Sequence, residues 1–327
     1  MKILPGWRYF RNLALLMLVG LVCLVALRQA YVAPIHWLWV LPLFYVGYGV
    51  WGAFAFAHPI RFRYWSHEIP RPDGRACEKV LFPSRDSLTL FGWYLPGTNR
   101  KALILAHGLG GAGIVMCNYA AFLAQAGYGV LMLDLRAHGS SDGDTSTYGV
   151  LEANDIAGAT DFLLARGDVD KIGVLGISIG AQSALRGALI CDSVGALVLE
   201  GLGPASIEDR IRSANAGERR KKLFVLWNRL LYGITFAEQW LFTFFSGQNP
   251  TPLTVESGKL APRPLLLIAC GAHEVEFNRR FCESAGQTCS LWELPKARHA
   301  AGLTYEPKEY PLRVVAFFDR ALNVDNQ

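Results

Sequence analysis

A serine lies between two glycines at residues 176–180, where the sequence reads Gly-Ile-Ser-Ile-Gly. The residues before it alternate apolar and small side chains as a buried strand does, and the residues after it favour a helix. A sharp turn between the two would hold Ser178 in a strained backbone and expose its hydroxyl, while the glycines let neighbouring backbone pass close. A serine held in this way can attack an acyl group, provided that a base, an acid and an oxyanion site lie nearby.

Two residues of the types needed beside such a serine follow predicted strands late in the chain. Glu274 comes just after one of these strands, and His299 comes just after the last. A neutral imidazole can take the serine proton near pH 7, and a buried carboxylate orients that imidazole and stabilises its protonated form. We therefore predict Ser178 as nucleophile, His299 as base and Glu274 as acid, with Glu276 as the alternative acid. Without such chemistry, His299 would be an ordinary loop residue and Glu274 a solvated charge.

A glycine-rich stretch, residues 107–113, follows the strand predicted to end at the centre of the sheet. Backbone N–H groups in such a turn can face a developing negative charge. We predict that the amides of Leu109 and Ile179 form the oxyanion hole. His107 is interpreted as a structural residue whose ring hydrogen-bonds and shapes the loop.

Strand and helix patterns alternate from residue 77 to the C-terminus. Eight strand-like runs are predicted, at 77–83, 88–96, 102–108, 129–135, 171–178, 195–201, 264–270 and 290–295. Helical patterns are found at 118–126, 150–165, 181–190, 277–285 and 309–322. From the third strand onward the strands are continuous apolar runs separated by helices, which indicates a mostly parallel sheet with helices on both faces. Because the carboxyl ends of parallel strands meet at one edge, Ser178, Glu274 and His299 are expected to lie there.

One connection, residues 204–262, is far longer than an ordinary link between a strand and a helix. Part of it, 219–247, begins with a basic cluster and continues with aromatic and aliphatic residues. We interpret this insertion as a helical lid over the site, with Trp227 and Trp240 as candidate substrate-contacting residues. The alternative interpretation is an extra helical layer packed on the domain.

Two uncharged apolar runs, 13–27 and 37–57, precede the predicted sheet domain. The second is long enough to cross a bilayer as a helix, whereas the first needs its flanking residues to complete a span. We predict transmembrane helices at 12–28 and 37–57, an anchor over 1–59 and a polar linker over 60–76. A cleaved signal peptide is the alternative for the first run.

The net charge of +5 is concentrated beside these apolar runs. The first 75 residues hold eight Lys or Arg against two acidic residues, and the rest of the chain is close to neutral, without a basic face for nucleic acid. The positive-inside rule then predicts that the N-terminus and everything after His58 lie in the cytoplasm. We expect the protein in a membrane, the inner or plasma membrane of a bacterium, with the sheet domain on the cytoplasmic side.

The seven cysteines show no CxxC pair and no Cys/His cluster with the spacing of a metal site. No metal is therefore predicted. Cys282 and Cys289 could pair in an oxidising compartment, but the preferred interpretation is buried free thiols.

From about Cys77 to the C-terminus, the sequence resembles the α/β-hydrolase superfamily, in particular its membrane-anchored acyl-hydrolase and serine-aminopeptidase-like branch. The resemblance rests on LTLFGWYLP at 88–96, His-Gly at 107–108, DLRAHGSS at 134–141 and the serine turn at 176–180. It implies the α/β-hydrolase fold over 77–327, with two transmembrane helices before it and a helical lid inserted in it.

The same resemblance bears on the site residues. The order Ser178, Glu274, His299 matches the family's order of nucleophile, acid and base. The family commonly has Asp where the stretch Gly271-Ala272-His273-Glu274 ends in Glu. Its loop at 134–141 is chiefly structural, so Asp134 and His138 are not counted as catalytic.

The implied function is that of a membrane-anchored serine hydrolase. It would cleave carboxylic ester or thioester bonds through an acyl-enzyme intermediate, without a cofactor, on a small-molecule or lipid-like acyl substrate. A serine peptidase or acyltransferase of the same fold, or a catalytically silent membrane-bound scaffold, is the alternative. The oligomeric state is left open by the sequence.

Overall fold

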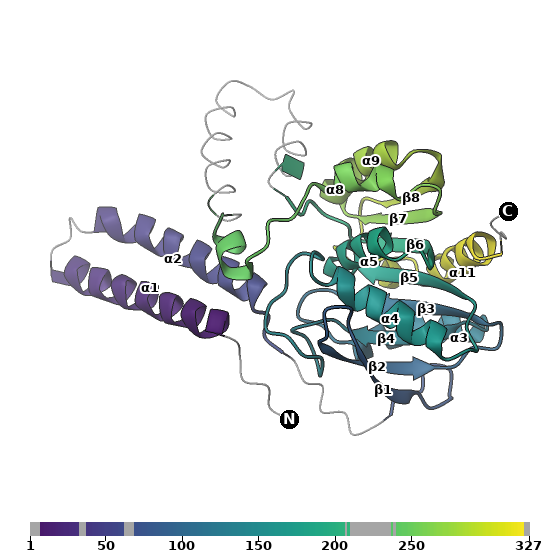
Figure 1. The fold of residues 1–327 in the computed structure, drawn as a ribbon. Coiled ribbons are helices and arrows are strands. Elements are labelled where there is room, and N and C mark those ends of the chain that lie inside the picture. Colours follow the sequence, from purple (N-terminus) through teal and green to yellow (C-terminus); the bar gives the residue numbers. More distant parts are fainter. Residues whose placement is uncertain are drawn as a thin grey trace. The chain divides into compact units, whose positions relative to one another are not determined.

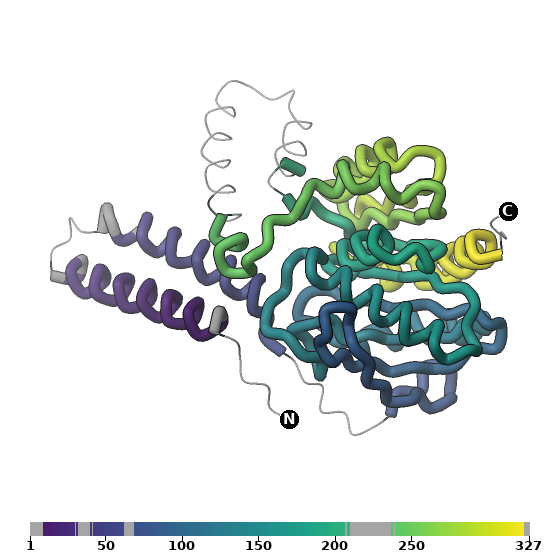
Figure 2. Tube along the Cα trace, viewed as in Figure 1, coloured from purple at the N-terminus to yellow at the C-terminus, as the bar shows by residue number. Residues whose placement is uncertain are grey.

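A computed structural model describes residues 7–32, 37–61, 69–206, 208–209, 237 and 240–323. The chain divides into two compact units, each built from several segments (Figures 1 and 2). The first unit comprises Met1–Ile60, Asp144–Ser146 and Arg219–Asn249, and the second Arg61–Gly143, Thr147–Glu218 and Pro250–Gln327.

The second unit is built on one eight-stranded sheet (Figure 1). Its strands are β1 (Glu78–Pro83), β2 (Thr89–Leu95), β3 (Lys101–Ala106), β4 (Gly129–Asp134), β5 (Lys171–Ile177), β6 (Val194–Glu200), β7 (Leu265–Cys270) and β8 (Cys289–Leu294). They lie in the order β1-β2-β4-β3-β5-β6-β7-β8, with β2 antiparallel to both its neighbours and every other pair parallel. The prediction of a mostly parallel eight-stranded sheet is confirmed.

Helices of the second unit pack on both faces of this sheet. They are η2 (Gly113–Met116), α3 (Cys117–Gln125), α4 (Ala153–Ala165), α5 (Ile179–Ile190), α8 (Leu253–Glu256), η3 (Ser257–Lys259), α9 (Ala272–Ala285), η4 (Gly286–Thr288), α10 (Gly302–Tyr305) and α11 (Glu309–Ala321). Apolar side chains of α4, α5 and α9 join the core on one face, and those of α3 and α11 join the core on the other.

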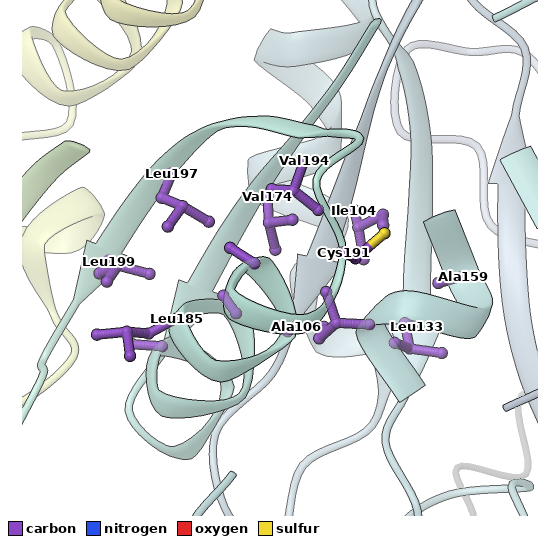
Figure 3. Packing of buried hydrophobic residues seen from close by; sticks show 14 of the residues in the cluster. Ile104, Ala106, Leu133, Ala159, Val174, Leu185, Cys191, Val194, Leu197 and Leu199 are labelled. Carbon is purple, nitrogen blue, oxygen red and sulfur yellow. The ribbon is translucent and has the colours of Figure 1, made fainter. Parts of the chain in front are cut away.

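The alternation of side chains along β3 explains why both faces are covered. Leu103 and Leu105 belong to one core cluster, whereas Ile104 and Ala106 belong to the other, and all four are fully buried. Figure 3 shows Ile104 and Ala106 with Leu185 of α5 on the latter face. Full burial of such an aliphatic side chain stabilises the fold by roughly 1.5–3 kcal/mol, so the central strands fix the sheet that positions the site.

Helix α9 departs from the prediction, because it begins at Ala272 and not near residue 277. Gly271 before it adopts a φ of +93°, which glycine tolerates best, and this turns the chain directly from β7 into the helix. Glu274 therefore lies in the first turn of α9 and not in a loop.

The described part of the first unit contains the helices α1 (Trp7–Val32) and α2 (Trp37–Ala57). Within the described residues, one helix is long and apolar enough to cross a membrane, over Tyr9–Gln29 of α1. The apolar stretch of α2 that was found, Pro42–Ala57, is shorter. In α1 the residues that flank the first apolar run extend the helix to spanning length, as the sequence predicts. Two transmembrane helices are therefore not confirmed.

One end of this helix pair carries a buried polar cluster. The side-chain amide of Asn12 in α1 lies 2.7 Å from Nε2 of His58, which follows α2, and donates a hydrogen bond to the Phe245 carbonyl at 3.1 Å. Nδ1 of His58 lies 2.7 Å from the Asp144 carbonyl. These contacts join the two helices to the end of the insertion within one unit.

The cysteines differ in part from the preferred interpretation. Cys282 and Cys289 form a disulfide, with their Cα atoms 5.4 Å apart, so the expectation of free thiols is wrong for this pair. The pair forms because the turn from α9 into β8 brings residues only seven apart face to face. The free cysteines Cys23, Cys77, Cys191 and Cys270 are buried, and Cys117 is half-buried.

Candidate active site

Ser178 occupies the turn between β5 and α5, as the Gly-Ile-Ser-Ile-Gly pattern predicts. Its φ of +56° lies in the left-handed region that a non-glycine residue rarely adopts. A Cβ atom on Gly180 would lie 2.2 Å from the Ala106 carbonyl oxygen, and one on Gly176 would lie 2.3 Å from the Gly180 carbonyl oxygen. Both glycines are thus required for α5 to pack closely against β5 and the end of β3.

The imidazole of His299 lies in the loop after β8 and bridges the other two predicted residues. Its Nε2 is 2.9 Å from Ser178 Oγ, and its Nδ1 is 2.5 Å from Glu274 Oε1. With a carboxylate at Nδ1, the ring keeps its proton there and turns an acceptor toward the serine hydroxyl. The structure therefore brings together the serine, the imidazole and the carboxylate from three separate strand ends.

The two candidate acids differ sharply in their surroundings. Glu274 is buried, and its Oε2 accepts a hydrogen bond from the Cys270 N–H at 2.8 Å. Glu276 is exposed and forms an ion pair with Arg280 at 2.9 Å. Residues two apart on a helix point in different directions, so only Glu274 of this pair reaches His299.

The glycine-rich turn after β3 lies against the serine. A Cβ atom on Gly108 would be 3.5 Å from Ser178 Cβ. Nδ1 of His107 donates to the Gly108 carbonyl at 2.7 Å, while its Nε2 accepts the Leu135 N–H at 3.2 Å. Because the peptide bond is planar and trans, the Leu109 N–H then points away from the His107 ring.

The second predicted oxyanion donor, the Ile179 N–H, is at the first position of α5. Amides in the first turn of a helix have no partner within the helix and are available to an anion. Leu109 and Ile179 thus occupy the turn and the helix start that flank Ser178.

Hydrogen bonding and burial shift the pKa values of His299 and His107 in opposite directions. The hydrogen bond to Glu274 raises the pKa of His299 above 6.5, against the lowering effect of its partial burial. Burial lowers the pKa of His107 to about 3, which keeps that ring neutral. Of the two rings, His299 is therefore the one suited to accept a proton.

A further carboxyl group, which the sequence reasoning missed, lies beneath this site. Glu200 ends β6 and is fully buried. Its backbone carbonyl accepts the Ser178 N–H at 2.8 Å, and its Oε1 accepts the Gly302 N–H at 2.7 Å. A glutamate at the end of an otherwise apolar strand was the available signal, because a buried charge requires partners.

The insertion is only partly covered by the described residues. Trp227 lies outside them. Trp240 is 62% exposed, and its ring stacks on that of Phe244 with the centroids 6.0 Å apart. The lid over the site remains a prediction.

The sheet order, the serine turn after β5 and the imidazole after β8 define an α/β hydrolase. The alpha/beta hydrolase family model matches residues 103–316, and the chain belongs to that family.

Two curated relatives are similar in sequence. The uncharacterised protein YfhR of Escherichia coli K12 is 26% identical over 277 residues, which cover 81% of this chain and 88% of YfhR. The polyketide transferase af380 of Aspergillus fumigatus is 35% identical over 129 residues, covering 37% of this chain and 44% of the transferase.

Among solved structures, the esterase Pf2001 of Pyrococcus furiosus is similar, with a TM-score of 0.63 and 25% sequence identity. The match covers 82% of this chain and the whole of the esterase chain. The protein is thus an α/β hydrolase with esterase-like structural neighbours.

Proposed function

We propose that the protein is a membrane-anchored serine hydrolase that cleaves carboxylic ester or thioester bonds. The observation that carries this proposal is the pair of hydrogen bonds from Ser178 Oγ to His299, 2.9 Å, and from His299 to Glu274, 2.5 Å. Such a chain joins a weak nucleophile to a base and the base to a group that stabilises its charge. The similarity to a solved esterase supports the same reaction class.

In the first half of the reaction, Nε2 of His299 takes the proton of Ser178 as Oγ attacks the carbonyl carbon. The carbonyl oxygen becomes an oxyanion, and the N–H groups of Leu109 and Ile179 donate to it. The imidazolium is stabilised by the Glu274 carboxylate and then gives its proton to the departing alcohol or thiol. The acyl group is left on Ser178 Oγ.

In the second half, His299 takes a proton from water, and the resulting hydroxide attacks the acyl carbon. The tetrahedral oxyanion occupies the same two N–H groups. Its collapse breaks the bond to Oγ, which regains its proton from His299, and the carboxylic acid leaves. Every proton is transferred through side chains of this chain, and the mechanism needs no cofactor.

The test is hydrolysis of a panel of aryl esters and acyl thioesters, of short to long acyl chain, by the purified full-length protein in detergent. Ser178→Ala should reduce kcat by roughly 10⁴-fold or more. The matched control is Ser183→Ala, because the Ser183 hydroxyl is buried in the same helix and donates to the Ile179 carbonyl at 2.7 Å. Equal activity of the wild type and Ser178→Ala would refute the proposal.

A second candidate function is acyl transfer to an alcohol or amine other than water. It is favoured by the partial similarity to a polyketide transferase, and the acyl-enzyme intermediate is common to both reactions. Adding a nucleophilic alcohol to the assay distinguishes them. A transferase would yield the new ester faster than the free acid, whereas a hydrolase would yield the acid.

We also propose that the sheet unit is held at the cytoplasmic face of the membrane by both α1 and α2. The basic residues beside the apolar runs support this orientation. If α1 alone spans, the sheet unit would lie on the opposite side, where a Cys282–Cys289 disulfide is favoured. A C-terminal reporter active only in the cytoplasm should be active; a reporter active only outside would overturn the orientation.

A further inference from the structure

Glu200 is a buried carboxyl group that the proposed reaction does not use. It is fully buried at the carboxyl end of β6, and no Lys or Arg side chain in the described part of the chain contacts it. Burying a carboxylate in this way is costly unless donors surround it. We propose that the Glu200 carboxylate is a positioning residue that fixes His299 by tying its loop to α11 and to the strand before Glu274. This inference rests on the proposed function.

Among the described residues, a backbone N–H, a thiol and a hydroxyl converge on the Glu200 carboxyl. Oε1 accepts the Gly302 N–H at 2.7 Å and lies 3.6 Å from the Cys270 thiol, and Oε2 accepts the Tyr310 hydroxyl at 2.6 Å. A backbone N–H can only donate, and the thiol and hydroxyl protons both have this carboxyl as their acceptor. The arrangement therefore suits an ionised carboxylate that accepts three hydrogen bonds.

Two of these partners, Gly302 and Cys270, belong to segments that carry a site residue. Gly302 is three residues after His299 and begins α10. Cys270 donates its backbone N–H to Glu274 Oε2 at 2.8 Å. Because the Glu200 backbone carbonyl also accepts the Ser178 N–H, this one residue contacts the segments of the serine, the acid and the base.

The loop that carries His299 is packed closely on this carboxylate. A Cβ atom on Gly302 would lie 3.0 Å from Glu200 Oε1 and 3.0 Å from a ring carbon of Tyr310. A Cβ atom on Gly201, whose φ is +67°, would lie 3.1 Å from Cε1 of His299. The imidazole therefore rests directly beyond the end of β6, where a shift of Gly302 would move it.

The negative charge of Glu200 also acts on the imidazole through space. Together with Glu274, it raises the pKa of His299. Burial raises the pKa of Glu200 itself, against its hydrogen bonds. Among the described residues, the titratable groups that face this carboxyl are Tyr310, Tyr119, Cys270, Glu274 and His299. Removing the Glu200 charge should therefore lower the pKa of His299, which a purely steric role would not do.

The test compares the full-length protein in detergent with its Glu200→Gln variant, which retains the shape of the side chain and loses the charge. We expect kcat to fall roughly 10- to 100-fold, the range for losing a charge-assisted hydrogen bond, with KM changed less than about twofold. The acidic limb of kcat/KM should move to lower pH. The His299 imidazole, assigned by comparison with His299→Ala, should titrate at lower pH in NMR spectra.

The matched control is Glu152→Gln. Glu152 is also fully buried and accepts hydrogen bonds from the N–H groups of Thr147 and Gly149. Loss of the Glu152 charge should lower the free energy of unfolding without changing the pKa of His299. Thermal unfolding of both variants separates a loss of folding from a loss of positioning.

Two results would overturn the inference: a Glu200→Gln variant with unchanged kcat and an unchanged His299 titration, or an equal shift in Glu152→Gln. Failure of the proposed function would look different, because the wild-type protein would then hydrolyse no ester, or would hydrolyse it as fast as Ser178→Ala does. In that case the NMR titration still decides whether Glu200 acts on His299.

Discussion

Two polar clusters of the sheet unit follow strand ends and differ in the groups that pair with their carboxylates. Beyond β4, the Arg136 guanidinium pairs with Asp86 at 2.7 Å and with Asp155 at 2.6 Å. At the ends of β6 and β7, Glu200 and Glu274 have no Lys or Arg partner among the described residues. Their donors are backbone N–H groups, a hydroxyl, a thiol and one imidazole.

The difference separates a structural cluster from a candidate active site. In the first cluster a permanent cation, the Arg136 guanidinium, pairs with both carboxylates, so the loop after β4 is held by ion pairs. In the second, the only basic side chain among the described residues that is hydrogen-bonded to the carboxylates is His299, and Glu274 raises the pKa of that imidazole above 6.5. Buried carboxylates without a Lys or Arg partner thus raise the pKa of the neighbouring imidazole, and a base in acyl transfer requires such a proton affinity.

The largest effect on turnover should come from His299, the group shared by the serine and the acid. His299→Ala should lower kcat nearly as far as Ser178→Ala, by roughly 10⁴-fold or more, because the members of such a triad act as one unit. The measurement is steady-state ester hydrolysis. The control is His138→Ala, since Nδ1 of this buried ring donates to the Arg136 carbonyl at 2.8 Å beside the structural cluster. The folded fraction of this variant should retain its kcat, and equal losses of kcat in both variants would remove the distinction.

Replacing the acid should have the next largest effect. Glu274→Gln should lower kcat by roughly 10³- to 10⁴-fold, because the imidazole loses the partner that fixes its tautomer and stabilises its charge. Glu276→Gln should change kcat less than about twofold, since that side chain is exposed and pairs with Arg280. The reverse ranking in hydrolysis assays would reassign the acid.

The pH profile should reflect the carboxylate environment of the base. Because Glu274 raises the pKa of His299, and only the neutral ring accepts the serine proton, kcat/KM should rise with pH through a midpoint above 6.5. In Glu274→Gln the residual activity should rise at a lower pH. A wild-type midpoint below 6.5 would contradict this account of the electrostatics.

The smallest effect on turnover should come from breaking the cluster around Arg136. Asp155→Asn leaves Arg136 with one carboxylate and should lower the free energy of unfolding by about 3–5 kcal/mol, as expected when a buried ion pair loses one partner. Denaturant unfolding measures this loss. At low denaturant the kcat of the folded enzyme should change less than about twofold; a large fall would give this cluster a part in the chemistry.

Much of the sheet unit could be predicted from the sequence, because its strands are continuous apolar runs and its serine turn has a local pattern. Each strand begins and ends within two residues of its predicted range. Ser178, Glu274 and His299 could be selected because each follows a strand and the ends of parallel strands converge. Their catalytic roles stay predictions until activity is measured.

Other features depended on contacts between residues distant in the chain. To choose between Glu274 and Glu276, one must know where α9 begins. Gly271, with its positive φ, sets that start. Glu200 could be noticed as a charge in an apolar strand, but its partners Gly302 and Tyr310 are more than a hundred residues away. Predicting the disulfide likewise required knowing that the chain turns between α9 and β8.

The most direct test of the central claim is peptide mass mapping of the full-length protein after reaction with a fluorophosphonate. The account predicts a single adduct on Ser178, formed far more slowly in His299→Ala. An adduct on another residue, or labelling of Ser178 that is equally fast without His299, would contradict it.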